Sequence, residues 1–148
     1  RKIVEDIQHI LENAELPPES LCIEITESTA ISDFEHTINI LHSLRTLGVQ
    51  ISLDDFGTGY SSLSLLKKLP LNELKIDKSF IPNSRENTVE WAIVQSIITM
   101  GHALGFRIVT EGIETEEQLD YMRSMKCDIV QGFYCGKPQP VEEFAKLL

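Results

Sequence analysis

The sequence is 148 residues long, with 42% apolar and 24% charged residues, which suits a single soluble globular domain. Its 23 acidic and 13 basic residues give a formal net charge of −10, so we expect no DNA partner. No run of 18 apolar residues occurs, and no membrane-spanning segment is therefore expected. Cys22, Cys127 and Cys135 show no CxxC spacing, which favours reduced thiols in a cytoplasmic domain over disulfides or zinc.

Two helices are predicted in the first third of the chain. The first covers residues 2–13 and ends before a Pro-Pro turn. The second opens at a capping box formed by Ser32 and Glu35 and stops at Gly48.

Two further helices are marked by similar signals. Asn87 with Glu90 opens one that ends at Gly105, and Thr115 with Gln118 opens the next. The buried stripe of the former is predicted to consist of Ile93, Ile97, Met100 and Leu104.

Short apolar runs alternate with these helices. They are predicted to be five strands, at residues 21–25, 49–54, 73–77, 106–111 and 128–131, followed by a last helix over residues 141–148. Regular alternation of strand and helix indicates an α/β fold whose parallel sheet is covered by helices.

Polar or charged residues stand where each predicted strand ends: Glu24 and Glu27, Asp54 and Asp55, Lys75 and Asp77, Glu111 and Glu114, and Gln131. In (β/α) barrels, the carboxyl ends of the strands form the active-site face. A flavodoxin-like open sheet also fits five strands, but it does not usually place a carboxylate at nearly every strand end. Acidic strand ends without a His or Cys cluster fit hard cations such as Mg²⁺ or Mn²⁺, and alone indicate metal-assisted hydrolysis of a phosphate ester.

Each of these residues also has a structural explanation when taken alone. Glu24 could be neutralised by a buried arginine, and Lys75 could be an ion-pair partner. Asp54 and Asp55 could cap a turn, and Glu111 lies shortly before a helix start, where acidic residues are favoured.

The strand ends belong to longer motifs that resemble those of the EAL domain family. The matching segments are EITES at 24–28, DDFGTGYSS at 54–62, KIDKSF at 75–80, EGIET at 111–115, QGF at 131–133 and PQP at 138–140. The order and spacing of these segments agree with those of the family motifs across essentially the whole chain. The resemblance implies a (β/α)₈ TIM-type barrel, of which residues 1–148 form the C-terminal part with about five strand–helix units. The Glu-Ala-Leu motif and an Asn metal ligand are then expected before Arg1.

The resemblance further implies hydrolysis of cyclic di-GMP to linear pGpG with two divalent cations, Mg²⁺ or Mn²⁺, in bacterial second-messenger signalling. Glu24 and Asp54 are expected to bind the first metal, with Asp54 bridging to the second and Asp55 on that side. Glu111 is expected to be the general base or a metal and water ligand, and Lys75 to hold the nucleophilic water or phosphate charge. The loop and substrate support is assigned to Glu27, Glu114, Gln131, Asp77, Phe56, Gly57, Thr58 and Gly59.

The resemblance leaves an inactive cyclic di-GMP receptor or interaction module as the alternative function. It also implies a homodimer and fusion to sensor or GGDEF domains, in a parent protein that could be membrane-anchored. The chain by itself could expose barrel strand edges and self-associate.

Overall fold

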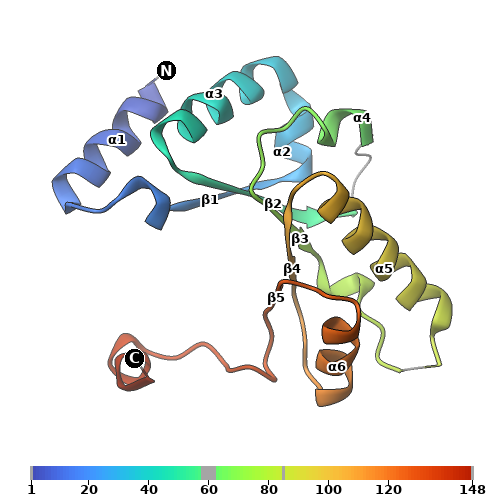
Figure 1. Ribbon diagram of the computed structural model, residues 1–148. Coiled ribbons are helices and arrows are strands. Elements are labelled where there is room, and N and C mark those ends of the chain that lie inside the picture. Colours follow the sequence, from blue (N-terminus) through green and yellow to red (C-terminus); the bar gives the residue numbers. More distant parts are fainter. Residues whose placement is uncertain (1, 58–62, 85, 148) are drawn as a thin grey trace.

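A computed structural model describes residues 2–57, 63–84 and 86–147 (Figure 1). Its centre is one five-stranded sheet whose neighbouring strands are all parallel. The strands are β1 (Cys22–Thr26), β2 (Gln50–Phe56), β3 (Glu73–Ile76), β4 (Arg107–Thr110) and β5 (Ile129–Val130). The five predicted strands are thus confirmed, with the last one shorter than expected.

The strands lie side by side in chain order, β1-β2-β3-β4-β5. A flavodoxin-like sheet reverses its strand order at a switch point, and no reversal occurs among these five strands. Figure 1 shows the strands along an arc, with α3, α5 and α6 on its convex side. The arrangement is therefore that of a barrel sector, as predicted, and not of an open doubly wound sheet.

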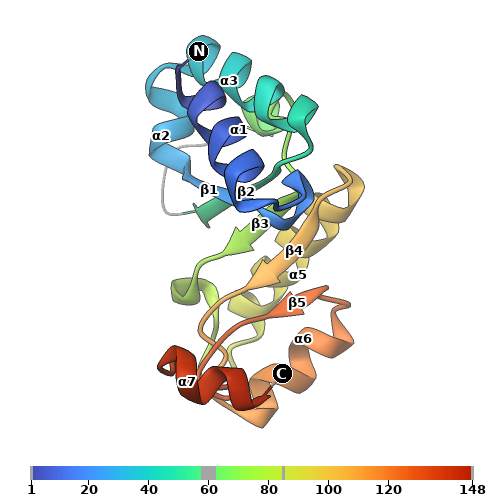
Figure 2. The same ribbon diagram turned by 90° about the vertical axis from the view of Figure 1, so that its left-hand side faces the viewer.

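Seven α-helices and three short 3₁₀ helices accompany the strands in the described part of the chain. The α-helices are α1 (Lys2–Ala14), α2 (Glu27–Ser32), α3 (Phe34–Leu47), α4 (Leu63–Leu66), α5 (Thr88–Ala103), α6 (Glu116–Ser124) and α7 (Val141–Phe144). The 3₁₀ helices are η1 (Pro18–Ser20), η2 (Lys78–Phe80) and η3 (Ala145–Leu147). Figure 2, turned by 90°, shows α7 at the opposite end of the molecule from α2 and α3. Within the described residues, no helix has both the length and the apolarity needed to cross a bilayer.

The main core lies between the convex face of the sheet and its helices. Its fully buried members include Leu44, Ile51, Leu53, Leu74, Ile76, Val94, Ile98, Ile108 and Met122. Each such side chain contributes about 1.5–3 kcal/mol by leaving water. This apolar layer anchors β2, β3 and β4 firmly, so that side chains on the other strand face are held on a rigid support.

The start of α3 differs from the prediction by one residue. Asp33, and not Ser32, is the N-cap, and its Oδ1 accepts a hydrogen bond from the His36 backbone N–H at 3.3 Å. The reason is the unpredicted helix α2, which begins directly after Thr26 and extends to Ser32. The predicted stop at Gly48 is confirmed, with φ +100°.

The predicted stripe of α5 is wrong in part. Ile97 is buried, but Ile93 is 45% exposed, and Trp91, Val94 and Ile98 lie in the core instead. The helix is apolar on most sides, so periodicity alone does not select a face. Gly101 lies on the buried face, where a Cβ would come within 2.3 Å of Ile108 Cδ1, so glycine lets α5 pack closely against the β4 side chain.

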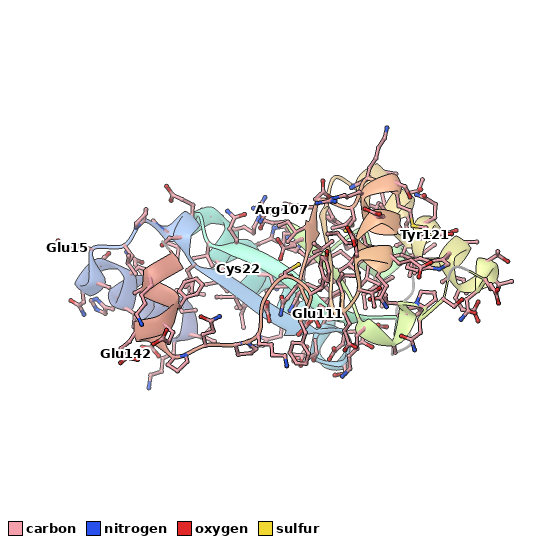
Figure 3. The ribbon with its side chains drawn as sticks, turned by 90° about the horizontal axis from the view of Figure 1, so that it is seen from below. Glu15, Cys22, Arg107, Glu111, Tyr121 and Glu142 are labelled. Atoms are coloured by element: carbon pink, nitrogen blue, oxygen red, sulfur yellow. The ribbon has the colours of Figure 1, made fainter. Side chains whose placement is uncertain are left out.

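Polar residues at the amino-terminal edge of the sheet serve its structure. The Arg107 guanidinium pairs with the Glu73 carboxylate at 2.9 Å, and Asn72 Oδ1 accepts from the Ile51 backbone N–H at 2.9 Å. Figure 3 labels Arg107, the first residue of β4, and Glu111, which directly follows the last residue of β4. Such pairs at the amino-terminal edge stabilise a barrel, whereas the active site of a barrel lies at the carboxyl-terminal edge.

Candidate active site

Lys75 is the centre of a charged cluster at the carboxyl-terminal edge of the sheet. Its ammonium Nζ lies 3.0 Å from Glu24 Oε1, 3.1 Å from Asp54 Oδ1 and 2.7 Å from Glu111 Oε1. Three carboxylates from β1, β2 and the end of β4 thus meet at one side chain of β3. The structure therefore brings together four residues that the sequence predicted as one site.

The cluster carries a net negative charge, and its members differ in exposure. Three carboxylates and one ammonium sum to a formal charge of −2. The Lys75 side chain is only 7% exposed, whereas Glu24 is 50% exposed and opens the cluster to solvent. Burial by itself lowers the pKa of Lys75, but the hydrogen bonds to Glu111, Glu24 and Asp54 outweigh burial and raise that pKa above the usual lysine range. Lys75 is consequently a permanent cation at neutral pH.

The end of β2 carries an irregularity at the two aspartates. Leu53 pairs with Leu74 and Phe56 with Ile76, so β2 has one residue more than β3 between these pairs. Asp55 adopts φ +56°, a left-handed conformation that is uncommon outside glycine, and its N–H donates to Asp54 Oδ1 at 3.1 Å. Strained backbone of this kind accumulates at functional sites, and here it directly follows a carboxylate of the Lys75 cluster.

Glu27 holds the beginning of the loop after β2. Its carboxylate Oε2 accepts a hydrogen bond from the Gly57 backbone N–H at 3.1 Å, and Glu27 is only 2% exposed. Glu27 thus contacts the first residue after β2, and its role as a support of this loop stays a prediction. Thr58 and Gly59, predicted for the same loop, lie outside the described residues.

Gly57 is required where this loop meets η2. It adopts φ +97°, and a Cβ there would lie 2.5 Å from the Phe80 ring. We expect Gly57→Ala to lower the free energy of unfolding by about 2 kcal/mol, because both the backbone and the ring must shift. Urea unfolding measures this. Gly136→Ala is the matched control, since no heavy atom lies within 4 Å of the added Cβ; equal loss in both variants would contradict the argument.

The other predicted residues lie beside the cluster. A hollow next to it is lined by Glu111, Glu114 and Gln131 together with Lys78 and Phe133. The backbone after β4 is hydrogen-bonded to the segments on both of its sides. Glu111 N–H donates to the Ile76 carbonyl oxygen in β3, and Ile113 N–H donates to the Gln131 carbonyl oxygen directly after β5. Glu114 and Gln131 are exposed, so their side chains are accessible from solvent.

Asp77 behaves differently from its predicted neighbours. Its Oδ1 accepts from the Ser79 backbone N–H at 2.9 Å and caps η2. Hydrogen bonds from Ser79 lower the pKa of Asp77, so it stays ionised in this local role. Asp77 therefore shapes the loop after β3, and its observed contacts are not with the Lys75 cluster.

Two residues with structural importance at this edge escaped the sequence reasoning. Phe80, in η2, packs against Gly57, and Gln118 joins the loops after β3 and β4 through its side-chain amide. The sequence pattern assigned Gln118 to a helix cap only. What distinguishes Gln118 is that it is a buried polar residue, and the periodicity of α6 does not reveal this burial.

The donor chemistry of the cluster fits a hard divalent cation. Carboxylate oxygens are the preferred ligands of Mg²⁺ and Mn²⁺, and the formal charge of −2 attracts a cation. Among the described residues, however, no three acidic, His or Cys side chains are already arranged as a metal-binding group. The Lys75 ammonium occupies the point where the carboxylates converge. These residues therefore supply oxygen ligands and charge but do not form a finished metal centre.

Comparisons with known proteins agree with this geometry. The sequence model of the EAL domain family matches residues 1–138. MucR of Pseudomonas aeruginosa, a bifunctional diguanylate cyclase/cyclic di-GMP phosphodiesterase, is 44% identical over 141 residues, which are 95% of this chain and 21% of MucR. A solved PaMucR phosphodiesterase structure in complex with c-di-GMP superposes with a TM-score of 0.89 and 44% identity, covering 95% of this chain and 57% of the solved one.

Two further solved structures show the same relation. The EAL domain of Mycobacterium smegmatis DcpA matches with a TM-score of 0.91 and 43% identity over 98% of this chain and 65% of its own. Klebsiella pneumoniae BlrP1, solved as a manganese/cyclic di-GMP complex, matches with a TM-score of 0.78 and 34% identity over 88% of this chain and 33% of its own. This chain thus spans about a fifth of MucR and less than two thirds of the solved relatives. With its motifs, barrel sector and family match in agreement, the chain belongs to the EAL domain family.

Proposed function

We propose that this chain is part of a metal-dependent phosphodiesterase that hydrolyses cyclic di-GMP to linear pGpG. The observation that carries the proposal is the convergence of Glu24, Asp54 and Glu111 on Lys75 within 3.1 Å. The c-di-GMP phosphodiesterase activity in the name of MucR and the ligand in the PaMucR structure support this substrate. The activity, substrate and partners of the whole protein are likewise proposed.

The roles follow from the positions of the side chains. Glu24 and Asp54 would bind a first divalent cation, and Asp55, which follows Asp54 in the bulge, would bind a second. Glu111, at 2.7 Å from Lys75, would orient water and take its proton. Lys75, always charged, would stabilise the developing phosphate charge.

Two divalent cations supply a nucleophilic water and charge stabilisation at the attacking and leaving oxygens. The proposed cations are Mg²⁺ or Mn²⁺, and the manganese complex of BlrP1 fits a divalent-cation requirement. Around them, Glu27 would keep the β2 loop in place through Gly57. Glu114 and Gln131, which line the hollow beside Glu111, would contact substrate or bound water.

The proposed setting is a cytoplasmic signalling domain that forms a homodimer and is fused to sensor or GGDEF domains. The length of MucR supports the fusion, since this chain covers only 21% of it. No DNA partner is proposed, because the formal net charge is −10. A receptor that binds cyclic di-GMP without cleaving it is the second candidate, favoured by the unfinished metal arrangement among the described residues.

The test uses purified protein containing the whole barrel, incubated with cyclic di-GMP and either Mn²⁺ or Mg²⁺. We expect pGpG to form, EDTA to stop the reaction, and excess Mn²⁺ to restore it. Chromatography of the nucleotides follows the conversion, and calorimetry measures binding. Tight binding of cyclic di-GMP without pGpG under every cation would identify the receptor and refute the hydrolase.

A further inference from the structure

Gln118 is a buried polar side chain that joins two loops at the edge of the candidate active site. It is 5% exposed, and its Oε1 accepts hydrogen bonds from the backbone N–H groups of Glu114 at 2.8 Å and Thr115 at 3.1 Å. Its Nε2 donates to the Pro82 carbonyl oxygen at 3.1 Å. Two donors face one end of the amide and a carbonyl faces the other, so only one orientation of the amide satisfies all three contacts.

Only one end of this amide serves the helix cap. The Thr115 hydroxyl accepts from the Gln118 N–H at 3.2 Å, which completes a capping box at the start of α6. Glu and Gln serve equally well at this position of a capping box, because only an acceptor is needed. The Nε2 donor is therefore superfluous to the cap, yet it reaches 36 residues back along the chain to Pro82.

Gln118 joins the segment after η2 to the loop that follows Glu111, whereas Lys75 itself lies within β3. Pro82 is buried and follows η2, whose Phe80 ring packs against Gly57. On the other side, Gln118 fixes the backbone of Glu114, three residues after Glu111. A second contact, the Trp91–Tyr121 ring stack at 4.4 Å, fastens α6 to α5. The helix α6 therefore stays packed on α5 when the hydrogen bond from Gln118 Nε2 to Pro82 is lost.

We propose that Gln118 is a positioning residue for the reaction: its amide holds the loop after β4 against the segment that follows η2, and thereby aims the Glu111 carboxylate at Lys75, 2.7 Å away. The inference rests on the phosphodiesterase function proposed above. Gln118 acts through the backbone and does not touch the reacting atoms. Its loss shifts catalytic groups and leaves substrate affinity largely intact.

Gln118→Glu tests this in the protein that contains the whole barrel. The carboxylate keeps the acceptor for Glu114 and Thr115, loses the donor to Pro82, and turns a charged oxygen toward the Pro82 carbonyl oxygen instead. With cyclic di-GMP and Mn²⁺ we expect kcat to fall about tenfold, because small misplacements of catalytic groups cost rate steeply. We expect KM to stay within about twofold, since a change in kcat alone reports lost transition-state positioning.

Thr115→Ala is the matched control, because it breaks the same capping box and leaves the Pro82 bond in place. It should lower the thermal midpoint with kcat near that of the wild type. If Gln118→Glu does not fold, Gln118→Met, which fills the same buried volume, must show the fall in kcat. Wild-type kcat in the folded Gln118 variant, or an equal fall in Thr115→Ala, overturns the inference alone. A wild-type protein that forms no pGpG refutes the proposed function and this inference with it.

Discussion

Replacing Glu111 with Gln is expected to lower kcat for cyclic di-GMP by about a thousandfold, because an amide cannot accept the proton of the attacking water. The substitution also changes the formal charge of the Lys75 cluster from −2 to −1, since one of three carboxylates is removed. We therefore expect weaker binding of Mn²⁺ as well. Single-turnover kinetics measures the first effect and a calorimetric Mn²⁺ titration measures the second.

Glu116→Gln provides the control for the change of charge. Glu116 is exposed in the first turn of α6, five residues further along the chain. It should leave kcat and Mn²⁺ affinity unchanged. A kcat for Glu111→Gln within tenfold of the wild type would remove Glu111 from the proposed role, whatever the effect on metal binding.

Local signals were sufficient to predict the frame of this fold. The alternation of strands and helices was predictable because apolar runs and helix caps depend on residues close together in the sequence. The Thr115 capping box is present as predicted. The failures lie where several local signals compete. Ser32 resembled an N-cap, but the hydroxyl of Thr26 starts an earlier helix, and the chain reaches Asp33 before α3 begins.

The composition of the candidate site was predictable, but its connections were not. Strand-end position was enough to select Glu24, Asp54, Lys75 and Glu111. That the three carboxylates share the Lys75 ammonium depends on the register of β1 to β4 and on the extra residue in β2, which are set by contacts distant in sequence. The Nε2 bond of Gln118 to Pro82 spans 36 residues and is equally beyond local pattern.

Replacing Lys75 with Met is expected to abolish most activity and to change how stability depends on pH. In the wild type, the raised pKa of Lys75 means that its contribution is fully present below the unfolded value of about 10.4 and is lost only as pH rises through the folded pKa. In the variant, three carboxylates face one another without the ammonium. We expect a loss of about 1–2 kcal/mol at pH 7, less than for a fully buried pair because Glu24 is 50% exposed.

The difference between wild type and Lys75→Met should shrink as pH rises above about 10.4 toward the raised pKa of Lys75, because the wild type then loses the contribution of its ammonium. Mn²⁺ should raise the thermal midpoint of the variant more than that of the wild type, because a cation then replaces the missing ammonium. Urea unfolding between pH 7 and 11 measures the first effect, thermal unfolding at pH 7 with and without Mn²⁺ measures the second, and exposed Lys67→Met serves as the control. A stability gap that is constant with pH would mean that Lys75 stabilises the sheet by packing. The balance of charge would then not be what organises this edge of the barrel.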